Sequence, residues 1–258
     1  MARIIAITNQ KGGVGKTTTT MNFGAGLRNR GKRVLLIDMD PQCSLSYIMR
    51  GIEDGPTVQD LILDPQADAA SVIQHLEEGD LIRSSRDLVT LEIQLTDVGR
   101  AFRLSKVLKQ LSAQYDYIII DSPPALGILT VNILTASNGV IVPALSDIFS
   151  LQGVGELFTT IQSVKEYCNP NLQLYGILMT RLSERRILDR SMREMLDETA
   201  QQMGTRVFAA SIREAVAVRE ASAERQSIFA YAPRSNQAKD YERFMEEYLA
   251  LEQQGIWG

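Results

Sequence analysis

The sequence predicts an α/β fold: a single doubly wound, mostly parallel sheet with helices on both faces. Apolar runs of strand length alternate with segments of helical periodicity along the 258 residues, which is typical of parallel strands joined by right-handed crossovers. The strand candidates are apolar without interruption, as strands buried on both faces are. A glycine-rich loop directly after the first candidate strand adds a third indication.

The first half of the chain is expected to begin as strand, helix and strand. Residues 3–8 are the first strand, 16–30 its helix, closed by Gly31, and 33–38 the second strand. Leu81 and Ile82 can form a brief strand. Short helices are expected at 44–49, 58–63 and 69–76.

The second half continues the alternation, with a helix over 104–112 leading into a strand at 117–121. No repeat, low-complexity segment or long Pro/Gly/Ser linker divides the chain, so residues 1–258 are expected to form one domain, although length alone does not decide this. Further strands are expected at 139–142, 172–179 and 207–212, and further helices at 152–167, 189–202 and 238–251.

Composition limits the class of protein. A hydrophobic content of 45% is enough for a substantial core, and the formal net charge of −4 excludes a globally basic protein, so any nucleic-acid affinity needs a local patch. The two cysteines, Cys43 and Cys168, have no metal-ligand spacing, which favours a reduced cytoplasmic chain. The early strand leaves no room for a signal peptide, and no apolar run approaches the ~20 residues that span a bilayer.

Residues 10–18 read QKGGVGKTT and have the character of a phosphate-binding loop. Three glycines within four positions let successive N–H groups point inward, and the following helix adds the positive end of its dipole. Lys16 is expected to contact the β- and γ-phosphates of a nucleotide, and the Thr17 hydroxyl to bind Mg²⁺. A turn that contains lysines by chance is the alternative, and the order of strand, loop and helix argues against it. The expected nucleotide contacts from this loop are Lys11, Gly12, Gly13, Val14, Gly15, Lys16, Thr17 and Thr18.

Acidic residues end two of the predicted strands. Asp38 and Asp40 follow the second strand, and Asp121 ends the strand at 117–121. Ligand sites in parallel sheets gather at the carboxyl ends of the strands, so we expect all three carboxylates near the loop. One can position an attacking water while others support the Mg²⁺ shell; for any one acid alone, helix capping is the competing interpretation.

Three segments, KGGVGKTT at 11–18, DMDPQ at 38–42 and YIIIDSPP at 117–124, resemble the ATPase motifs of ParA partition proteins. The resemblance implies the deviant Walker A class of P-loop NTPases in the ParA/MinD superfamily, marked by Gln10 in place of a glycine and by the second lysine, Lys11. It also implies ATP and Mg²⁺, an ATP-dependent homodimer in which Lys11 reaches the partner's phosphates, and Asp40 as the residue that aligns the hydrolytic water. Lys11, Lys16 and Asp40 would be catalytic, and Thr17, Asp38 and Asp121 would hold the metal, the aspartates through water.

The likeness is to the short, Soj-like form, because the first motif lies at the N-terminus without a preceding helix-turn-helix segment. That form implies non-specific binding of double-stranded DNA, a nucleoid-associated location in the cytoplasm, and a ParB-type centromere-binding or adaptor protein that stimulates hydrolysis. One departure is Cys43-Ser44-Leu45, where relatives often carry Gly-Asn-Ala, so this loop can contact the partner or DNA differently.

The segment 181–234 is the candidate DNA-binding surface. It holds ten arginines, no lysine and eight acidic residues, while the whole chain is acidic. Guanidinium groups suit phosphate, but several of these arginines are spaced three or four residues from an acid and can be ordinary surface ion pairs. Relatives often place a DNA-binding arginine two residues before Arg219, where this chain has Ala217. The candidates are Arg181, Arg185, Arg186, Arg213 and Arg219.

Other classes share part of this pattern. A MinD-like regulator on the membrane would end in a basic amphipathic helix, but the segment 241–249 is acidic, and Trp257 is expected in a frayed terminus. An iron protein of the nitrogenase type would need a cysteine pair from each protomer, which Cys43 and Cys168 do not match. An ATPase that moves a protein cargo remains an alternative function. The single histidine, His75, is expected on a surface helix.

Overall fold

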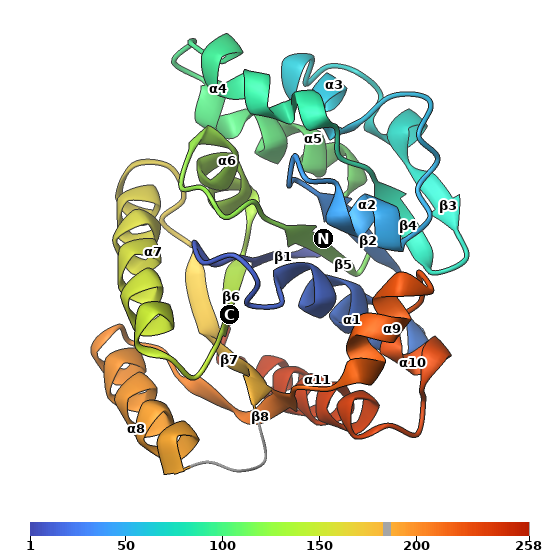
Figure 1. The fold of residues 1–258 in the computed structure, drawn as a ribbon. Coiled ribbons are helices and arrows are strands. Elements are labelled where there is room, and N and C mark those ends of the chain that lie inside the picture. Colours follow the sequence, from blue (N-terminus) through green and yellow to red (C-terminus); the bar gives the residue numbers. More distant parts are fainter. Residues whose placement is uncertain (183–186, 258) are drawn as a thin grey trace.

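The computed structural model describes residues 1–182 and 187–257, and its centre is one eight-stranded sheet (Figure 1). Within the described residues the strand order is β3-β4-β2-β5-β1-β6-β7-β8, and every neighbouring pair is parallel except β3 with β4. The strands are β1 (Arg3–Ile7), β2 (Val34–Asp38), β3 (Gln74–Leu76), β4 (Gly79–Ile82), β5 (Tyr117–Asp121), β6 (Gly139–Ala144), β7 (Gln173–Leu182) and β8 (Val207–Arg213).

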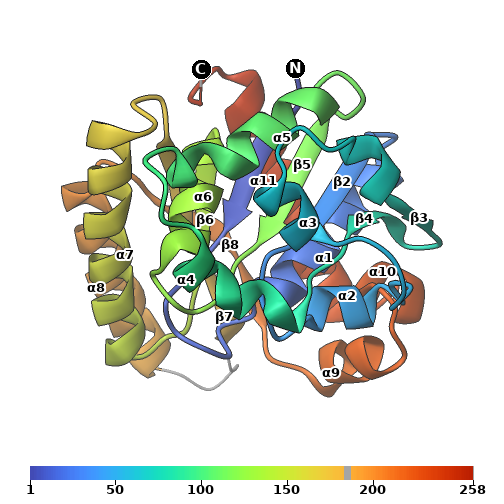
Figure 2. The ribbon, with the colours of Figure 1, turned by 90° about the horizontal axis from the view of Figure 1, so that it is seen from above.

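Helices cover both faces of this sheet (Figures 1 and 2). On one face lie α1 (Lys16–Asn29), α2 (Ser44–Ile48), α10 (Ile228–Tyr231) and α11 (Asn236–Gln253). On the other lie α3 (Val58–Leu63), α5 (Arg103–Leu111), α6 (Ile128–Ala136), α7 (Ile148–Tyr167) and α8 (Ile187–Gln202). Two further helices, α4 (Leu91–Gln94) and α9 (Val216–Ala223), and short 3₁₀ turns at Ala69–Val72, Arg86–Thr90 and Arg100–Phe102 complete the connections.

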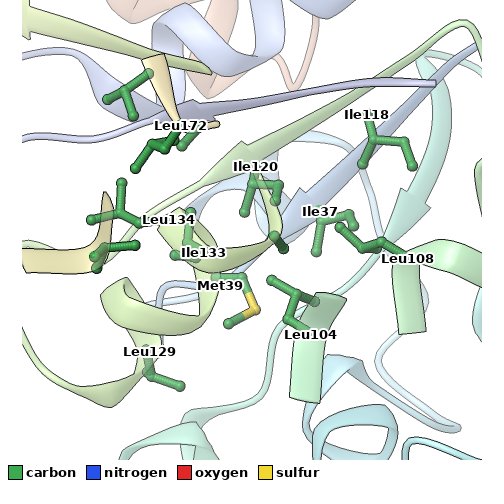
Figure 3. Close-up of a cluster of buried hydrophobic side chains, with 14 of the residues drawn as sticks. Ile37, Met39, Leu104, Leu108, Ile118, Ile120, Leu129, Ile133, Leu134 and Leu172 are labelled. Carbon is green, nitrogen blue, oxygen red and sulfur yellow. The ribbon is translucent and has the colours of Figure 1, made fainter. Parts of the chain in front are cut away.

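Alternate side chains of each central strand enter two separate cores, as the two-residue period of a strand requires. Ile118 and Ile120 of β5 pack with α5 and α6, whereas Tyr117 and Ile119 of the same strand pack with α1 and α11. Figure 3 shows part of the first core, in which Ile37 and Ile120 lie among leucines of α5 and α6. Burial on both faces explains why the strand sequences are apolar without alternation.

The predicted fold class is confirmed, and the differences are local. The segment 69–76 is not a helix: it forms a 3₁₀ turn and then β3, because pairing with β4 at the sheet edge overrides its helical spacing. His75 therefore lies on a strand, exposed, with Nδ1 2.7 Å from an Asp80 carboxylate oxygen. Helix α6 was not predicted, because it is buried nearly all round and shows no polar face.

The C-terminal segment is packed, contrary to the expectation of a frayed end. Trp257 is 4% exposed and stacks on Tyr248 and Tyr175 at ring distances of 4.8 and 4.5 Å. Arg3 of β1 donates a hydrogen bond to the Trp257 carbonyl oxygen, which ties this end of the chain to the first strand. In the part of the chain that the structure describes, no helix has the length and apolar character needed to cross a bilayer.

Candidate nucleotide site

The glycine-rich loop connects β1 to α1 at the carboxyl edge of the sheet. Gly13 and Gly15 have φ angles of 73° and 88°, a left-handed conformation that favours glycine, and Gly15 is the residue that precedes the first turn of α1. A Cβ built on Gly12 or Gly13 would meet no atom within 4 Å, so the loop faces open space. The loop thus leaves room for a phosphate chain at the positive end of a helix.

Lys16 begins α1 beneath this loop and is 7% exposed. Its Nζ donates to the Lys11 carbonyl oxygen at 3.2 Å. Burial lowers the pKa of Lys16, and the nearby Asp121 and Asp40 act in the opposite direction. A buried ammonium group beneath a glycine-rich loop is suited to bind a polyphosphate.

Asp121 ends β5 beside the loop and provides the clearest indication of a cation site. It is fully buried; Oδ1 accepts a hydrogen bond from Thr20 Oγ1 at 3.4 Å, and Oδ2 has no hydrogen-bond partner among the described residues. Burial and the proximity of Asp38 raise the pKa of Asp121 well above its ordinary value, while the Thr17 hydroxyl and Lys16 oppose the shift. A buried carboxylate oxygen without a donor, next to a threonine hydroxyl, is chemically suited to a Mg²⁺ shell.

Across the part of the chain that is described, no three His, Cys, Asp or Glu side chains gather into a metal site. Mg²⁺ does not need such a cage, because it is commonly held by one or two protein oxygens, substrate phosphates and waters. The residues present therefore fit a cation that arrives with a nucleotide.

Asp38, at the end of β2 and in register with Asp121, is occupied by its own chain. Its carboxylate accepts hydrogen bonds from Ser46 N, Ser46 Oγ and Asp40 N at 2.8, 2.7 and 3.0 Å. Burial raises the pKa of Asp38 to about 6, and these three donors oppose the shift. The visible role of Asp38 is to attach α2 and the Asp40 loop to the sheet edge, so its part in the metal shell stays a prediction.

Asp40 lines the same cleft as the loop glycines and Lys16. One carboxylate oxygen accepts a hydrogen bond from Gln42 N at 2.9 Å, and the Asp40 carbonyl oxygen accepts one from Ser84 Oγ at 2.7 Å. The position of the Asp40 carboxylate at the cleft wall is compatible with the predicted contact to a water.

Lys11 points away from its own phosphate loop. Its Nζ lies 2.7 and 2.6 Å from the two carboxylate oxygens of Asp147 and 5.7 Å from the centre of the Phe149 ring. Asp147 also accepts a hydrogen bond from Ser150 N at 2.8 Å and so caps α7. The Lys11 ammonium lowers the pKa of Asp147, against the effect of partial burial. The two lysines of the loop therefore occupy different environments.

The cleft has a volume of about 520 Å³ and extends from the loop to the ends of β7 and β8. Thr180 Oγ1 donates to the Val14 carbonyl oxygen at 2.7 Å, which ties β7 to the loop. The lining of the cleft also includes Ile48, Tyr241 and Val218, apolar side chains suited to contact a nucleotide base.

The arginines predicted to contact DNA fall into different surroundings. Arg181 pairs with Glu214 at 2.9 Å, and Arg213 pairs with the buried Asp240 at 2.6 Å. Arg219 is exposed on α9, and all three line the nucleotide cleft. Arg185 and Arg186 lie outside the described residues.

Sequence reasoning missed several residues that build the site. Ser46 holds Asp38, Thr20 donates to Asp121, and Asp147 holds Lys11. Thr180 could have been found, because it lies toward the carboxyl end of a strand in the sheet. Asp147 had no such signal, since nothing local shows that residues 136 positions apart are in contact.

Fold and site together define a P-loop nucleotide-binding protein. A family model described as an AAA domain matches residues 2–174. Over 256 residues the chain is 39% identical to the sporulation initiation inhibitor protein Soj of Bacillus subtilis, covering 97% of this chain and 99% of Soj. It is 35% identical to the chromosome partitioning protein ParA of Caulobacter vibrioides, covering 97% and 95%.

Among solved structures, cobyrinic acid a,c-diamide synthase of Mycobacterium smegmatis with bound ADP and magnesium superposes with a TM-score of 0.85 at 32% identity, covering 99% of this chain and 97% of that one. The chain belongs to the ParA family of partition ATPases.

Proposed function

We propose that this ParA-family ATPase is an ATP-driven dimerisation switch that binds double-stranded DNA non-specifically as the ATP dimer and releases it when a ParB-type partner stimulates hydrolysis. Such a cycle would segregate plasmid or chromosomal DNA and would place the protein on the nucleoid. The observation that carries the proposal is the separation of the two lysines: Lys16 is buried under its own loop, whereas Lys11 lies at the rim on Asp147.

The surroundings of Lys11 support an interface. Ile148 and Phe149 follow Asp147 at the start of α7 and are 60% and 70% exposed. Exposed apolar side chains beside a lysine that can leave its present partner are what a second protomer would cover. In the dimer each Lys11 would exchange Asp147 for the phosphates bound by the partner.

Hydrolysis joins a water oxygen to the γ-phosphorus and breaks the bond from that phosphorus to the bridging oxygen of the β-phosphate. Phosphoryl transfer of this kind depends on positioning and on neutralising charge. Lys16 and Lys11 would neutralise the phosphate oxygens, and Asp40 would orient the attacking water. Mg²⁺, when bound with ATP, would neutralise further negative charge on the β- and γ-phosphates; Thr17 and Asp121 would hold it, and Asp38 would contribute through water.

The test of the proposed function is duplex binding as a function of nucleotide. With ATP and Mg²⁺ we expect binding without sequence preference and with a steep loss in salt; with ADP we expect little binding, because one protomer offers too few phosphate contacts. Equal affinity in ATP and ADP, or none in ATP, would refute the DNA-partition function.

An ATPase that positions a protein cargo, or the division site in the MinD manner, is the alternative. For the membrane form, α11 offers no free apolar face: Tyr241, Phe244 and Tyr248 are buried against the sheet. A chain that forms ATP dimers but never binds duplex would favour the protein cargo.

A further inference from the structure

A second groove lies next to the nucleotide cleft, between α2 and α9, which are adjacent in both views (Figures 1 and 2). Its volume is about 840 Å³. Gln42, Ser44 and Ile48 line both this groove and the nucleotide cleft, so the segment after Asp40 forms their common wall. We call it the α2–α9 groove.

Three arginines line the α2–α9 groove: Arg83 and Arg86 follow β4, and Arg225 follows α9. None of the three forms an ion pair with a carboxylate among the described residues. Arg83 donates to the Gly55 carbonyl oxygen, and its buried Nε has no acceptor there. Arg225 lies over the Tyr47 ring, 3.9 Å from its centre. Among the described residues of the lining, Glu53 is the one that carries a carboxylate.

This arrangement differs from that of arginines elsewhere in the chain, many of which have a carboxylate partner. In an acidic chain, three guanidinium groups without a carboxylate partner around one groove attract an anion, and their planar forks match phosphate oxygens. The ion-paired arginines are Arg3, Arg30, Arg33, Arg103, Arg181, Arg193 and Arg213.

The groove floor is connected to the hydrolytic residues. Ser84, next to Arg83, donates through Oγ to the Asp40 carbonyl oxygen at 2.7 Å, and its N–H donates to Ser46 Oγ at 2.9 Å. Ser46 in turn holds Asp38. An anion bound by Arg83 would therefore contact the residue that directly precedes Ser84 in this hydrogen-bond chain.

We propose that the α2–α9 groove binds the phosphodiester backbone of DNA through Arg83, Arg86 and Arg225. This rests on the proposed function and adds a binding surface outside most of the arginine-rich segment 181–234. We assign the groove to a phosphodiester and not to an acidic peptide, because Arg225 directly follows α9, the helix that carries Arg219, so the groove continues from a predicted DNA contact. Because the segment after Asp40 forms one wall of the groove, the affinity for DNA would depend on that segment. The segment would thereby couple DNA binding to the nucleotide state.

The test is the salt dependence of duplex binding by the full chain with a non-hydrolysable ATP analogue and Mg²⁺. R86Q/R225Q removes the charges of Arg86, which is exposed, and of Arg225, which is half-buried. It leaves Arg83, at the floor of the groove, in place. The slope of log affinity against log salt should fall by roughly 1.8 for each protomer that contacts the duplex, which at 0.1 M salt corresponds to roughly 60-fold weaker binding per protomer from lost counterion release. K109Q/R243Q, with the same loss of charge at exposed positions on α5 and α11, should keep the wild-type slope.

The outcomes separate the two proposals. If wild type binds duplex in an ATP-dependent way and R86Q/R225Q binds with an unchanged slope, the groove assignment is overturned while the proposed function stands. If wild type binds no duplex, the proposed function and the groove assignment both fail. ATP-dependent dimers of R86Q/R225Q in light scattering show that the variant is folded, and R225K, which keeps the charge, should retain most of the slope.

A free phosphate ligand would present the same chemistry, so inorganic tripolyphosphate is titrated into the chain with ADP and Mg²⁺ filling the nucleotide cleft. Weak binding of tripolyphosphate is expected. Tight binding that R86Q/R225Q abolishes, together with unchanged duplex affinity, would assign the groove to a small anion and overturn its assignment to DNA.

Discussion

Replacing Asp147 by asparagine should strengthen ATP-dependent dimerisation. Asp147 holds the Lys11 ammonium at 2.6 Å, with side-chain exposures of 37% and 27% for the aspartate and the lysine. If Lys11 crosses to the partner's phosphates, this pair must break once in each protomer before the dimer forms. Asparagine removes the charge but keeps an oxygen that can accept from Ser150 N, so the cap of α7 is preserved.

The magnitude follows from the exposure of the pair. Ion pairs this accessible to water contribute roughly 0.2–1 kcal/mol each. Removing one from each protomer should therefore make dimerisation more favourable by roughly 0.4–2 kcal/mol, which raises the association constant about 2- to 30-fold. The assay is light scattering or sedimentation over a dilution series with ATP and Mg²⁺, and Asp147→Ala, which also loses the cap, is the control. An association constant for Asp147→Asn equal to or below that of wild type would refute the idea that Asp147 retains Lys11 before dimerisation.

The other predictions concern the catalytic residues and pH. Asp40→Ala should bind ATP and form the dimer but hydrolyse ATP roughly 10²- to 10⁴-fold more slowly, because it loses the group that positions water. Asp40→Asn keeps the acceptor for Gln42 N and should be comparably slow. Turnover near the wild-type rate would remove Asp40 from the mechanism. Lys16→Ala should abolish nucleotide binding in a fluorescent-nucleotide titration, while Lys11→Ala should bind nucleotide and fail to dimerise; ATP dimers of Lys11→Ala would disprove the cross-interface role. Burial raises the pKa of Asp38 in the folded state from 3.8 to about 6, so between these pH values the folded chain binds a proton that the unfolded chain does not. The contribution of Asp38 to the free energy of unfolding therefore falls as pH rises from about 4 to about 6. In denaturant titrations from pH 4 to 8, the free energy of unfolding of wild type should fall by up to about 3 kcal/mol relative to that of Asp38→Asn. If the free energies of the two proteins change with pH in parallel, the raised pKa of Asp38 is contradicted.

Much of the fold could be predicted because its signals are local. The strand 117–121 and the helix 58–63 have the predicted bounds, since buried parallel strands and capped amphipathic turns are visible in short windows of sequence. The errors arose where tertiary contacts decide. The spacing of residues 69–76 is helical, but the free edge of β4 recruits residues 74–76 as a strand. Trp257 stacks on the rings of Tyr175, which is distant in sequence, and of Tyr248 in α11, and neither contact is visible in the sequence around residue 257.

The site was predictable to a similar degree. The loop, Asp40 and Asp121 lie at one edge of the sheet, because the carboxyl ends of adjacent parallel strands share that edge. What the motifs do not reveal is the set of contacts that hold these residues, such as Ser46 on Asp38 and Asp147 on Lys11. The charge count of 181–234 likewise could not show that Arg181 and Arg213 are ion-paired whereas Arg225 faces a groove.

The most direct test of the central claim is the molecular mass of the chain in solution with each nucleotide. With Mg²⁺ and a non-hydrolysable ATP analogue, multi-angle light scattering should give twice the 28.7 kDa of one chain, and with ADP it should give the single-chain mass. The same mass in both nucleotides, whether that of a monomer or of a dimer, would contradict an ATP-driven dimerisation switch.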